Sequence, residues 1–471
     1  MSIDPVEVEV LTAADAEPAQ ARAAGAMVAA GLVPGDRVTF CLPSSAALLC
    51  AVLGALRIGV VPVLLNATLL DVERDGLIAD ADPQMVVKDH EALARLDRGA
   101  PVGLARYPLA RPMHYTSGTT GRAKGVWSGR WDEDTAREAF CDEADLWSFG
   151  PLDVHLVCSP MYHSVSVRFA GGTLLRGGTC VILARFDADT ARNALLGRHG
   201  PVPNTTFMAP SALRRLLDAA GDGEDDHFGS LRLLVHAGSP CPPSLKREAM
   251  ARVGPGVLWE FYGSTEGQFT VCSPEEWMAR PGTVGRARPG RSLAVDGDGV
   301  IWCRAPRFAQ FTYWRDPSKS DSAWRDGSFT VRDLGRLDDD GYLFIDGRRD
   351  DLIISGGVNV YPAEVEAALI EVDGVAEVAV FGVTDDRWGQ RVCAALVPVA
   401  GLDPSSKTRL IEAVRAHAAQ SLAPYKRPKQ LEVVEALPRT ATGKVQRRLV
   451  PGLVPGLVRE VPKAPVTPDT G

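Results

Sequence analysis

The sequence lacks three features that would place it in a specialised class of protein. Its nine cysteines are scattered without any CxxC pair, so neither a disulfide framework nor a zinc ribbon is indicated. It has no surplus of basic residues, and a formal net charge of -8 argues against nucleic acid as the main partner. It also opens with the acidic stretch MSIDPVEVEV, where a secretory signal would carry a basic and then an apolar run. We therefore expect a cytoplasmic protein with reduced, mostly buried thiols.

A long uninterrupted apolar run is also missing. Residues 46–65 come closest, with the sequence AALLCAVLGALRIGVVPVLL, and are long enough to cross a bilayer. However, Arg57 stands near the middle of the run and Pro62 follows it. A buried helix over 44–57 and a buried strand over 60–65 explain the segment better, so we predict no membrane partner.

The length and the pattern of apolar runs predict the fold class. A chain of 471 residues is too long for one ordinary hydrophobic core, so two or more domains are expected. Between residues 37 and 261 short apolar runs alternate with helix-like segments, which indicates βαβ units and largely parallel sheets with helices on both faces. The predicted strands are 37–42, 59–65, 154–159, 179–183, 205–208 and 231–236.

The composition and the predicted secondary structure of the sequence change twice after this region. Beyond Gly282 it becomes glycine-punctuated and rich in β-type segments, which indicates a small barrel or meander. Beyond Asp350 it predicts a compact α+β region. The elements expected there are a helix that begins near Pro362, strands over 375–383 and 391–400, and a helix near 407–420.

A loop rich in glycine and hydroxyl side chains carries the strongest local signal. It runs from Tyr115 to Val126 and reads YTSGTTGRAKGV. Glycines let successive backbone N–H groups converge on an anion, hydroxyls add donors, and Lys124 supplies a positive charge. The loop is not a Walker A motif, because Gly125 follows the lysine where that motif needs Ser or Thr. A flexible surface turn is the alternative, but we interpret the loop as a phosphate-binding site.

Three further segments, taken with this loop, make the sequence resemble a known family. They read YGSTE over 262–266, GRRDDLIISGGVNVYP over 347–362, and LPRTATGK over 437–444. Their order and approximate spacing resemble those of the adenylate-forming superfamily, which includes acyl- and aryl-CoA synthetases, adenylation domains of nonribosomal peptide synthetases and luciferases. The resemblance extends over nearly the whole chain.

The resemblance implies an α/β protein of two domains. Residues 1–349 would form a large N-terminal domain of layered parallel sheets with helices and a small β-barrel. Residues 350–454 would form a small, mobile α+β C-terminal domain that acts as a lid. The Pro-rich residues 455–471 are expected to be disordered.

The resemblance also assigns the subsites for the phosphates of ATP. Glu266 would bind Mg²⁺, an ion that prefers oxygen ligands, and Thr265 would contact the α-phosphate. The residues that would hold the triphosphate are Thr116, Ser117, Gly118, Thr119, Thr120, Gly121 and Lys124.

The adenosine part of ATP would be bound by residues from several segments. Tyr262 would stack on adenine, and Asp333 would accept both ribose hydroxyls, as a carboxylate with two oxygens can. Arg348 would support the same ribose. The wall of the adenine pocket would be made by Ala237, Gly238 and Ser239. One departure from the family pattern is Arg332, which stands where a glycine usually precedes the ribose-binding acid.

In the small domain, Lys444 matches the family's catalytic lysine. That lysine reaches the α-phosphate region and the carboxylate and stabilises charge as the adenylate forms; a solvated lysine in a basic tail is the alternative. Asp350 matches the hinge about which the small domain rotates between the two half-reactions. Gly356 and Gly357 match the segment that lines the pantetheine tunnel of CoA, and a simple tight turn is the alternative for this pair.

His163 bears on the choice of acid. It aligns with a position near the reacting carboxylate and the tunnel gate, although an ordinary packed histidine is an equal alternative. Members that activate amino acids carry an aspartate in this neighbourhood to bind the substrate ammonium group, and none is evident here. The following Val165, Val167 and Phe169 suit an apolar acid.

Together the motifs predict an AMP-forming acid–thiol ligase. ATP and an apolar monocarboxylic acid would give an acyl-adenylate and pyrophosphate, and CoA would then take the acyl group. The expected small-molecule partners are the carboxylic acid, ATP with Mg²⁺, and CoA. A ligase that loads a carrier protein, an enzyme of one half-reaction only, and a non-catalytic nucleotide-binding relative remain alternatives. A homodimer and a separate carrier protein both stay open as protein partners.

Overall fold

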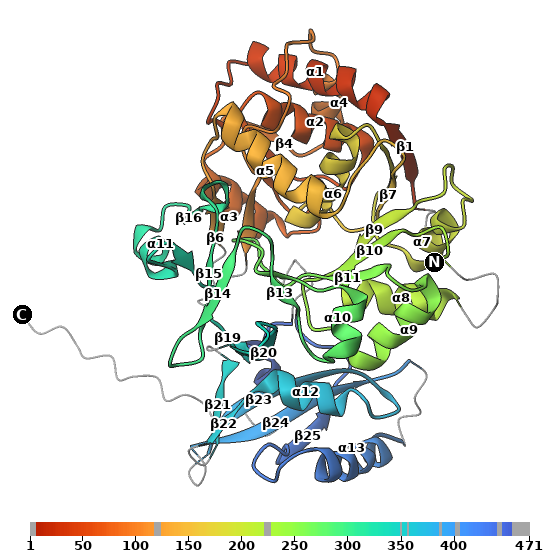
Figure 1. Ribbon diagram of the computed structural model, residues 1–471, viewed down its shortest axis with the longest axis vertical. Coiled ribbons are helices and arrows are strands. Elements are labelled where there is room, and N and C mark those ends of the chain that lie inside the picture. Colours follow the sequence, from red (N-terminus) through yellow and green to blue (C-terminus); the bar gives the residue numbers. More distant parts are fainter. Residues whose placement is uncertain are drawn as a thin grey trace, which may run out of the picture. The chain divides into compact units, whose positions relative to one another are not determined.

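The computed structural model describes residues 6–116, 124–220, 228–348, 351–355, 358–385, 389–400, 406–439 and 445–454 (Figure 1). The chain divides into two compact units, Met1–Ile345 and Asp346–Gly471. The predicted hinge, Asp350, lies outside the described residues, and the domain boundary next to it stays a prediction.

The first six-stranded sheet of unit 1 carries the beginning and the end of the predicted phosphate loop. Its strands are, in spatial order, β16 (Thr312–Tyr313), β6 (Lys124–Trp127), β5 (Met113–Thr116), β3 (Val61–Leu64), β2 (Arg37–Phe40) and β4 (Met85–Val87). Strands β2 to β5 are parallel, whereas β6 and β16 run antiparallel to their neighbours. The accompanying helices are α1 (Ala13–Ala29), α2 (Ala46–Arg57), α3 (Asp71–Ala81) and α4 (His90–Leu96).

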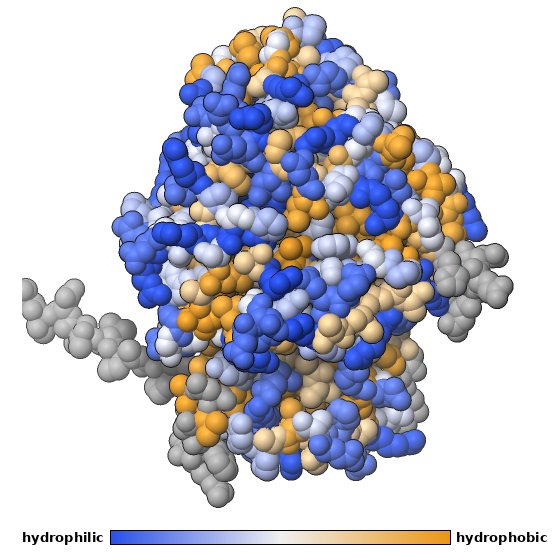
Figure 2. Space-filling view, in the orientation of Figure 1, coloured by the Kyte–Doolittle hydropathy of each residue, from blue (hydrophilic) through white to orange (hydrophobic). Residues whose placement is uncertain are grey.

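Helix α2 and strand β3 account for the apolar run that could have been mistaken for a membrane span. Ser45 caps the N-terminus of the helix by accepting a hydrogen bond from the Leu48 N–H with its side chain, and most residues of the helix are buried. Arg57 at its end is 6% exposed and donates to Glu17 (2.5 Å) and Gln20 (2.9 Å). The predicted helix and strand are therefore confirmed. No helix in the described ranges combines the length and the apolar character needed to cross a bilayer, and Figure 2 shows hydrophilic and hydrophobic residues interspersed over the visible face.

The second six-stranded sheet confirms the βαβ pattern. Its strands are, in spatial order, β1 (Val8–Thr12), β8 (Thr179–Leu183), β7 (Val154–Val157), β9 (Thr205–Met208), β10 (Leu233–His236) and β11 (Leu258–Glu260). All neighbours are parallel except the edge strand β1, which pairs antiparallel with β8. The helices of this region are α5 (Glu133–Leu146), α6 (Ser164–Leu175), α7 (Ala188–Leu195), α8 (Pro210–Ala220) and α9 (Pro243–Val253).

The β-rich region predicted after residue 282 completes unit 1. It contains the antiparallel sheet β14 (Ser292–Val295), β15 (Ile301–Arg304), β18 (Ser328–Phe329) and β17 (Trp324–Arg325). Two-stranded ribbons pair β12 (Thr270–Val271) with β13 (Arg286–Ala287), and β19 (Asp333–Leu337) with β20 (Leu343–Arg348). The short helices are α10 (Pro274–Ala279), η2 (Arg307–Ala309) and α11 (Pro317–Ala323). Buried aromatic side chains, among them Phe269, Phe311 and Phe329, form the core.

Unit 2 is the predicted α+β region. Its sheet contains β22 (Val358–Val360), β21 (Ile353–Ser355), β24 (Gly389–Pro398), β23 (Val375–Asp385) and β25 (Gln430–Val433). The remaining elements are α12 (Pro362–Leu369), α13 (Lys407–Ser421) and η5 (Arg447–Leu453). Helix α12 begins at Pro362, where the missing N–H costs no intrahelical bond. Both helices and both long strands predicted from the sequence are thus confirmed.

Candidate active site

The predicted phosphate loop connects two adjacent antiparallel strands. Thr116 ends β5 and Lys124 begins β6, and the two residues are direct partners in the ladder. The ends of the loop are therefore held together by backbone hydrogen bonds. Five members of the predicted triphosphate site lie outside the described residues, so their phosphate contacts stay predictions. They are Ser117, Gly118, Thr119, Thr120 and Gly121.

Tyr313 connects Lys124 with Glu266. This tyrosine lies in β16 and pairs with Val126 of β6, the strand that begins where the phosphate loop ends. The Lys124 Nζ lies 5.7 Å from the centroid of the Tyr313 ring, and the Tyr313 hydroxyl donates to Glu266 Oε1 (2.9 Å). Burial and the Glu266 carboxylate raise the pKa of Tyr313, so the phenol keeps its proton. No motif in the sequence had singled out Tyr313.

The surroundings of Glu266 suit Mg²⁺. The residue is 7% exposed, and one carboxylate oxygen is held by Tyr313. In the described part of the chain, no group of three or more His, Cys, Asp and Glu side chains is gathered as in a metal cage. Mg²⁺ is typically bound by one or two carboxylates, water and substrate phosphates, so a single buried carboxylate near the phosphate loop fits this ion.

The YGSTE motif forms a tight loop that fixes its side chains. Gly263 and Gln268 form an isolated bridge, and the Ser264 N–H donates to the Gly267 carbonyl (2.8 Å). A Cβ atom on Gly263 would lie 2.7 Å from that same carbonyl oxygen. Because no side chain fits there, the position requires glycine. The backbone carbonyl of Thr265 accepts a hydrogen bond from Arg111 Nη2 (3.1 Å).

The residues predicted to bind adenine and ribose are in direct contact. The Tyr262 hydroxyl donates to Asp333 Oδ2 (2.7 Å), although the two residues lie far apart in the sequence. Asp333 is 7% exposed at the start of β19. Arg332, just before it, has a left-handed backbone with φ of 65°. This conformation favours glycine, which explains why a glycine is usual at this position in the resembled family.

The carboxyl ends of the parallel strands bring further predicted residues to one edge of the second sheet. Ala237 and Gly238 follow β10, Tyr262 follows the adjacent β11, and His163 follows β7. Gly238 has φ of 94°, and Ser239 next to it is exposed. Ligands of α/β proteins bind at this edge of the sheet, where loops rather than helices cover the strand ends.

His163 is the N-terminal cap residue of α6 and is only half-buried. Its ring lies 4.6 Å from that of Tyr162, centroid to centroid. A second histidine, His114 on β5, is 3% exposed and has its Nδ1 2.9 Å from the Tyr162 carbonyl oxygen. Burial lowers the pKa of His114 to about 3, so it is neutral. His114 directly precedes the phosphate loop and belongs to none of the four motifs.

The predicted residues of unit 2 are described only in part. Arg348 is the last residue of β20. Ser355 and Val358 are ladder partners at the facing ends of β21 and β22. Gly356, Gly357 and Lys444 lie outside the described residues, and their predicted roles stay predictions.

Sequence comparisons identify the family. The profile of the AMP-binding enzyme family matches residues 4–106 and 112–304, and that of the AMP-binding enzyme C-terminal domain matches residues 364–444. The chain belongs to the AMP-binding enzyme family. The indoleacetate–CoA ligase of Aromatoleum aromaticum is 30% identical, over 92% of this chain and 91% of that protein. The fatty acid–[acyl-carrier-protein] ligase ScoC of Streptomyces coeruleorubidus is 31% identical, over 91% of this chain and 88% of that protein.

Solved structures of the family agree with this assignment. The o-succinylbenzoate CoA synthetase of Bacillus subtilis, in complex with its acyl-adenylate intermediate, superimposes with a TM-score of 0.79 at 26% identity, covering 93% of this chain and 92% of that chain. The same enzyme has been solved with ATP and a magnesium ion. The fold and the adenylate-forming family expected from the four motifs are therefore confirmed.

Proposed function

We propose that this AMP-binding enzyme is an AMP-forming CoA ligase that activates a carboxylic acid with an apolar body. In the first step, a carboxylate oxygen attacks the α-phosphorus of ATP, the bond to the β-phosphate breaks, and pyrophosphate leaves. In the second step, the thiol of CoA attacks the acyl carbon and AMP leaves. The names of two relatives support both the acid and the acceptor. They are the indoleacetate–CoA ligase and the long-chain-fatty-acid–CoA ligase FadD13 of Mycobacterium tuberculosis, which is 28% identical over 91% of this chain and 90% of that protein.

The observation that carries the proposal is the connection between Lys124, Tyr313 and Glu266. Lys124 and Glu266 are the two charges that a triphosphate with its metal needs, and Tyr313 lies beside the lysine and donates a hydrogen bond to the carboxylate. Mg²⁺ bound at Glu266 would neutralise charge on the departing pyrophosphate. The neighbouring pair Tyr262 and Asp333 offers an aromatic face and a carboxylate for adenine and ribose.

The other assigned residues have matching chemistry. Thr265 carries a hydroxyl for the α-phosphate, and its backbone is held by Arg111. His163 lies at the start of α6, next to the strand ends, and is proposed to lie near the reacting carboxylate. Lys444 is proposed to stabilise charge on the carboxylate and the α-phosphate during adenylation, and Asp350 to be the hinge of the lid.

Pyrophosphate exchange into ATP, measured over a panel of carboxylic acids, tests the first step. Glu266→Gln should lower exchange by on the order of a hundredfold, the scale for losing a charge partner of the transition state. Glu275→Gln is the matched control, because Glu275 is exposed in the first turn of α10. Equal activity of the two variants, or exchange with α-amino acids alone, would contradict the proposal.

Carrier-protein loading is the second candidate, because ScoC acts on an acyl carrier protein. Thioester formation with free CoA and with a phosphopantetheinylated carrier, measured on the same acid, separates the two. If kcat/KM for the carrier exceeds kcat/KM for CoA by more than about tenfold, which corresponds to about 1.4 kcal/mol, the acceptor is the carrier protein and not CoA.

A further inference from the structure

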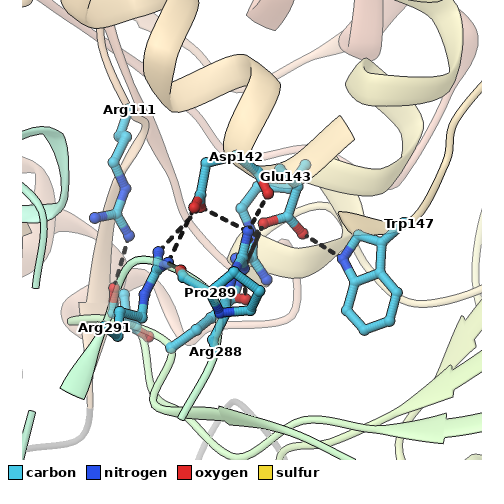
Figure 3. A network of polar contacts seen from close by, with 10 residues as sticks. Arg111, Asp142, Glu143, Trp147, Arg288, Pro289 and Arg291 are labelled. Carbon is cyan, nitrogen blue, oxygen red and sulfur yellow. Dashed lines mark hydrogen bonds and ion pairs between the residues drawn. The ribbon is translucent and has the colours of Figure 1, made fainter. Parts of the chain in front are cut away.

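A largely buried cluster of charged side chains lies beside the 262–268 loop (Figure 3). Its carboxylates come from helix α5, and its guanidinium groups come from α6, from the segment before β5 and from the turn between β13 and β14. Among the described residues, the members are two acids, Asp142 and Glu143, and four arginines, Arg111, Arg168, Arg288 and Arg291. With four arginines and two acids, the cluster therefore has a net charge of +2.

Arg288 and Arg291 form the shortest ion pairs with the two carboxylates. Arg288 is 1% exposed and donates to Asp142 Oδ2 (2.6 Å) and to Glu143 Oε2 (3.0 Å). Arg291 contacts both oxygens of Asp142, each at 3.0 Å. Figure 3 shows these two guanidinium groups facing the end of α5. Glu143 also accepts from Trp147 Nε1 (2.9 Å) and Gln268 Nε2 (3.1 Å). Little capacity to accept hydrogen bonds is left for other cations.

Arg168 and Arg111 are the least compensated of the four arginines. The contact of Arg168 Nη1 with Glu143 is long, at 3.4 Å, and its buried Nε has no hydrogen-bond partner within the described ranges. In the same ranges Arg111 forms no ion pair with a carboxylate and donates to the neutral Thr265 carbonyl (3.1 Å). Burial, with Arg168 nearby, lowers the pKa of Arg111 to about 10, which leaves it positively charged at neutral pH. A partly desolvated cation without a counter-charge is costly, and a bound anion would remove that cost.

A cavity of about 140 Å³ lies between these arginines and an apolar wall. The wall includes Leu53 and Leu56 of α2, Phe140 of α5 and Val167 of α6. The buried Ser264 Oγ also borders the cavity and has no hydrogen-bond partner in the described part of the chain. An engineered apolar cavity of about 150 Å³ takes up one benzene ring, so the free space here suits a group of that size.

We propose that this cavity binds the body of the acid substrate and that Arg111 and Arg168 bind a second carboxylate on it. The inference rests on the proposed acid-activating function. The reacting carboxylate becomes an uncharged acyl group when the adenylate forms, so it cannot balance the arginines throughout the cycle. A second carboxylate stays anionic in the acid, the adenylate and the thioester. The substrate would then be a dicarboxylic acid with a compact apolar body, whereas the sequence predicted a monocarboxylic acid.

The first arm of the test compares matched substrates on the full-length enzyme. Pyrophosphate exchange is measured with benzenedicarboxylic and C5 to C8 alkanedicarboxylic acids, with the monomethyl ester of each, and with benzoic and hexanoic acids. For at least one pair we expect kcat/KM of the diacid to exceed that of its ester by about tenfold or more, the effect of one charge-assisted contact.

The second arm removes one arginine. In Arg168→Gln, the preference for the diacid over its ester should fall to about threefold or less, because kcat/KM falls much more for the diacid than for the ester. Arg176→Gln is the control, because Arg176 caps the same helix but pairs with Asp145 (2.6 Å) and does not line the cavity. If Arg168 instead bound the reacting carboxylate, the variant would lose activity on diacid and ester alike.

The outcomes separate the inference from the proposed function. Exchange with monoacids or esters at least as fast as with every diacid overturns the second-carboxylate site and leaves the ligase intact. The same conclusion follows if Arg168→Gln keeps the full preference for the diacid, or if it lowers kcat/KM equally for the diacid and its ester. Absence of exchange with every acid overturns the proposed function and the inference with it.

Discussion

Glu143→Gln removes one negative charge from the buried cluster of α5 while it keeps the volume of the side chain. The carboxylate is 14% exposed and accepts hydrogen bonds from Trp147, Gln268 and Arg288. Burial alone would raise its pKa, but Arg168 and Arg288 outweigh burial and lower the pKa of Glu143 from 4.5 to about 2. The ionised form is therefore strongly preferred in the folded protein.

The size of the effect follows from this pKa difference. At about 1.36 kcal/mol per pKa unit, the ionised carboxylate stabilises the folded protein by roughly 3 kcal/mol at neutral pH. Breaking a buried ion pair by removing one partner costs about 3–5 kcal/mol, which agrees. Because the folded-state pKa is the lower one, the stabilisation is complete above pH 4.5 and is lost as the pH falls toward 2.

Urea unfolding followed by tryptophan fluorescence measures the difference. At pH 7 the free energy of unfolding of Glu143→Gln should be lower than that of the wild type by about 3 kcal/mol, and the gap should narrow as the pH falls below 4.5. Glu138→Gln, an exposed position on the same helix, should stay within about 0.5 kcal/mol. If the two variants lose the same stability, the ion pairs around Glu143 do not hold this region together.

Three further substitutions test single positions. Arg332→Gly should raise the melting temperature slightly, because φ of 65° costs an L-residue about 1–2 kcal/mol. The greater conformational freedom of glycine in the unfolded chain offsets about half of this gain. A lower melting temperature would contradict this expectation. Lys444→Ala should slow adenylation about a hundredfold in quenched-flow assays yet largely spare thioester formation from supplied acyl-adenylate; equal losses would make Lys444 structural. Asp350→Pro should largely spare adenylation and slow thioester formation, because proline fixes φ at the proposed hinge. Unimpaired thioester formation would show that Asp350 is not the hinge.

Local patterns were enough to predict most of the central elements. The buried parallel strands, such as Thr179–Leu183 and Leu233–His236, are continuous apolar runs between helical segments, and such runs are visible without any partner. The N-terminal strand Val8–Thr12 was not predicted. Its alternation of valine and glutamate is compatible with a strand, but its stability comes from pairing with β8, which no local pattern reveals.

The site was predictable where a motif exists and not elsewhere. The motifs led to Tyr262 and Asp333, but only the structure shows the hydrogen bond between them. Tyr313 was missed because it stands in no motif and reaches Glu266 only through the pairing of β16 with β6. The arginine cluster was missed for a similar reason. Its members come from separate segments, and in a sequence an arginine is by default a solvated surface residue.

The 262–268 loop is where the two proposed subsites meet. Glu266 in this loop is held by Tyr313, next to the lysine of the phosphate loop, whereas the carbonyl of the preceding Thr265 is held by Arg111 of the charged cluster. The tight closure around Gly263 leaves the loop little freedom to adjust these contacts independently. An anion that draws Arg111 toward the cavity would therefore act on the backbone of the residue proposed to contact the α-phosphate. If both proposed subsites are correct, the acid would affect the nucleotide site through this hydrogen bond, and recognition of the acid and alignment of ATP would depend on the same loop.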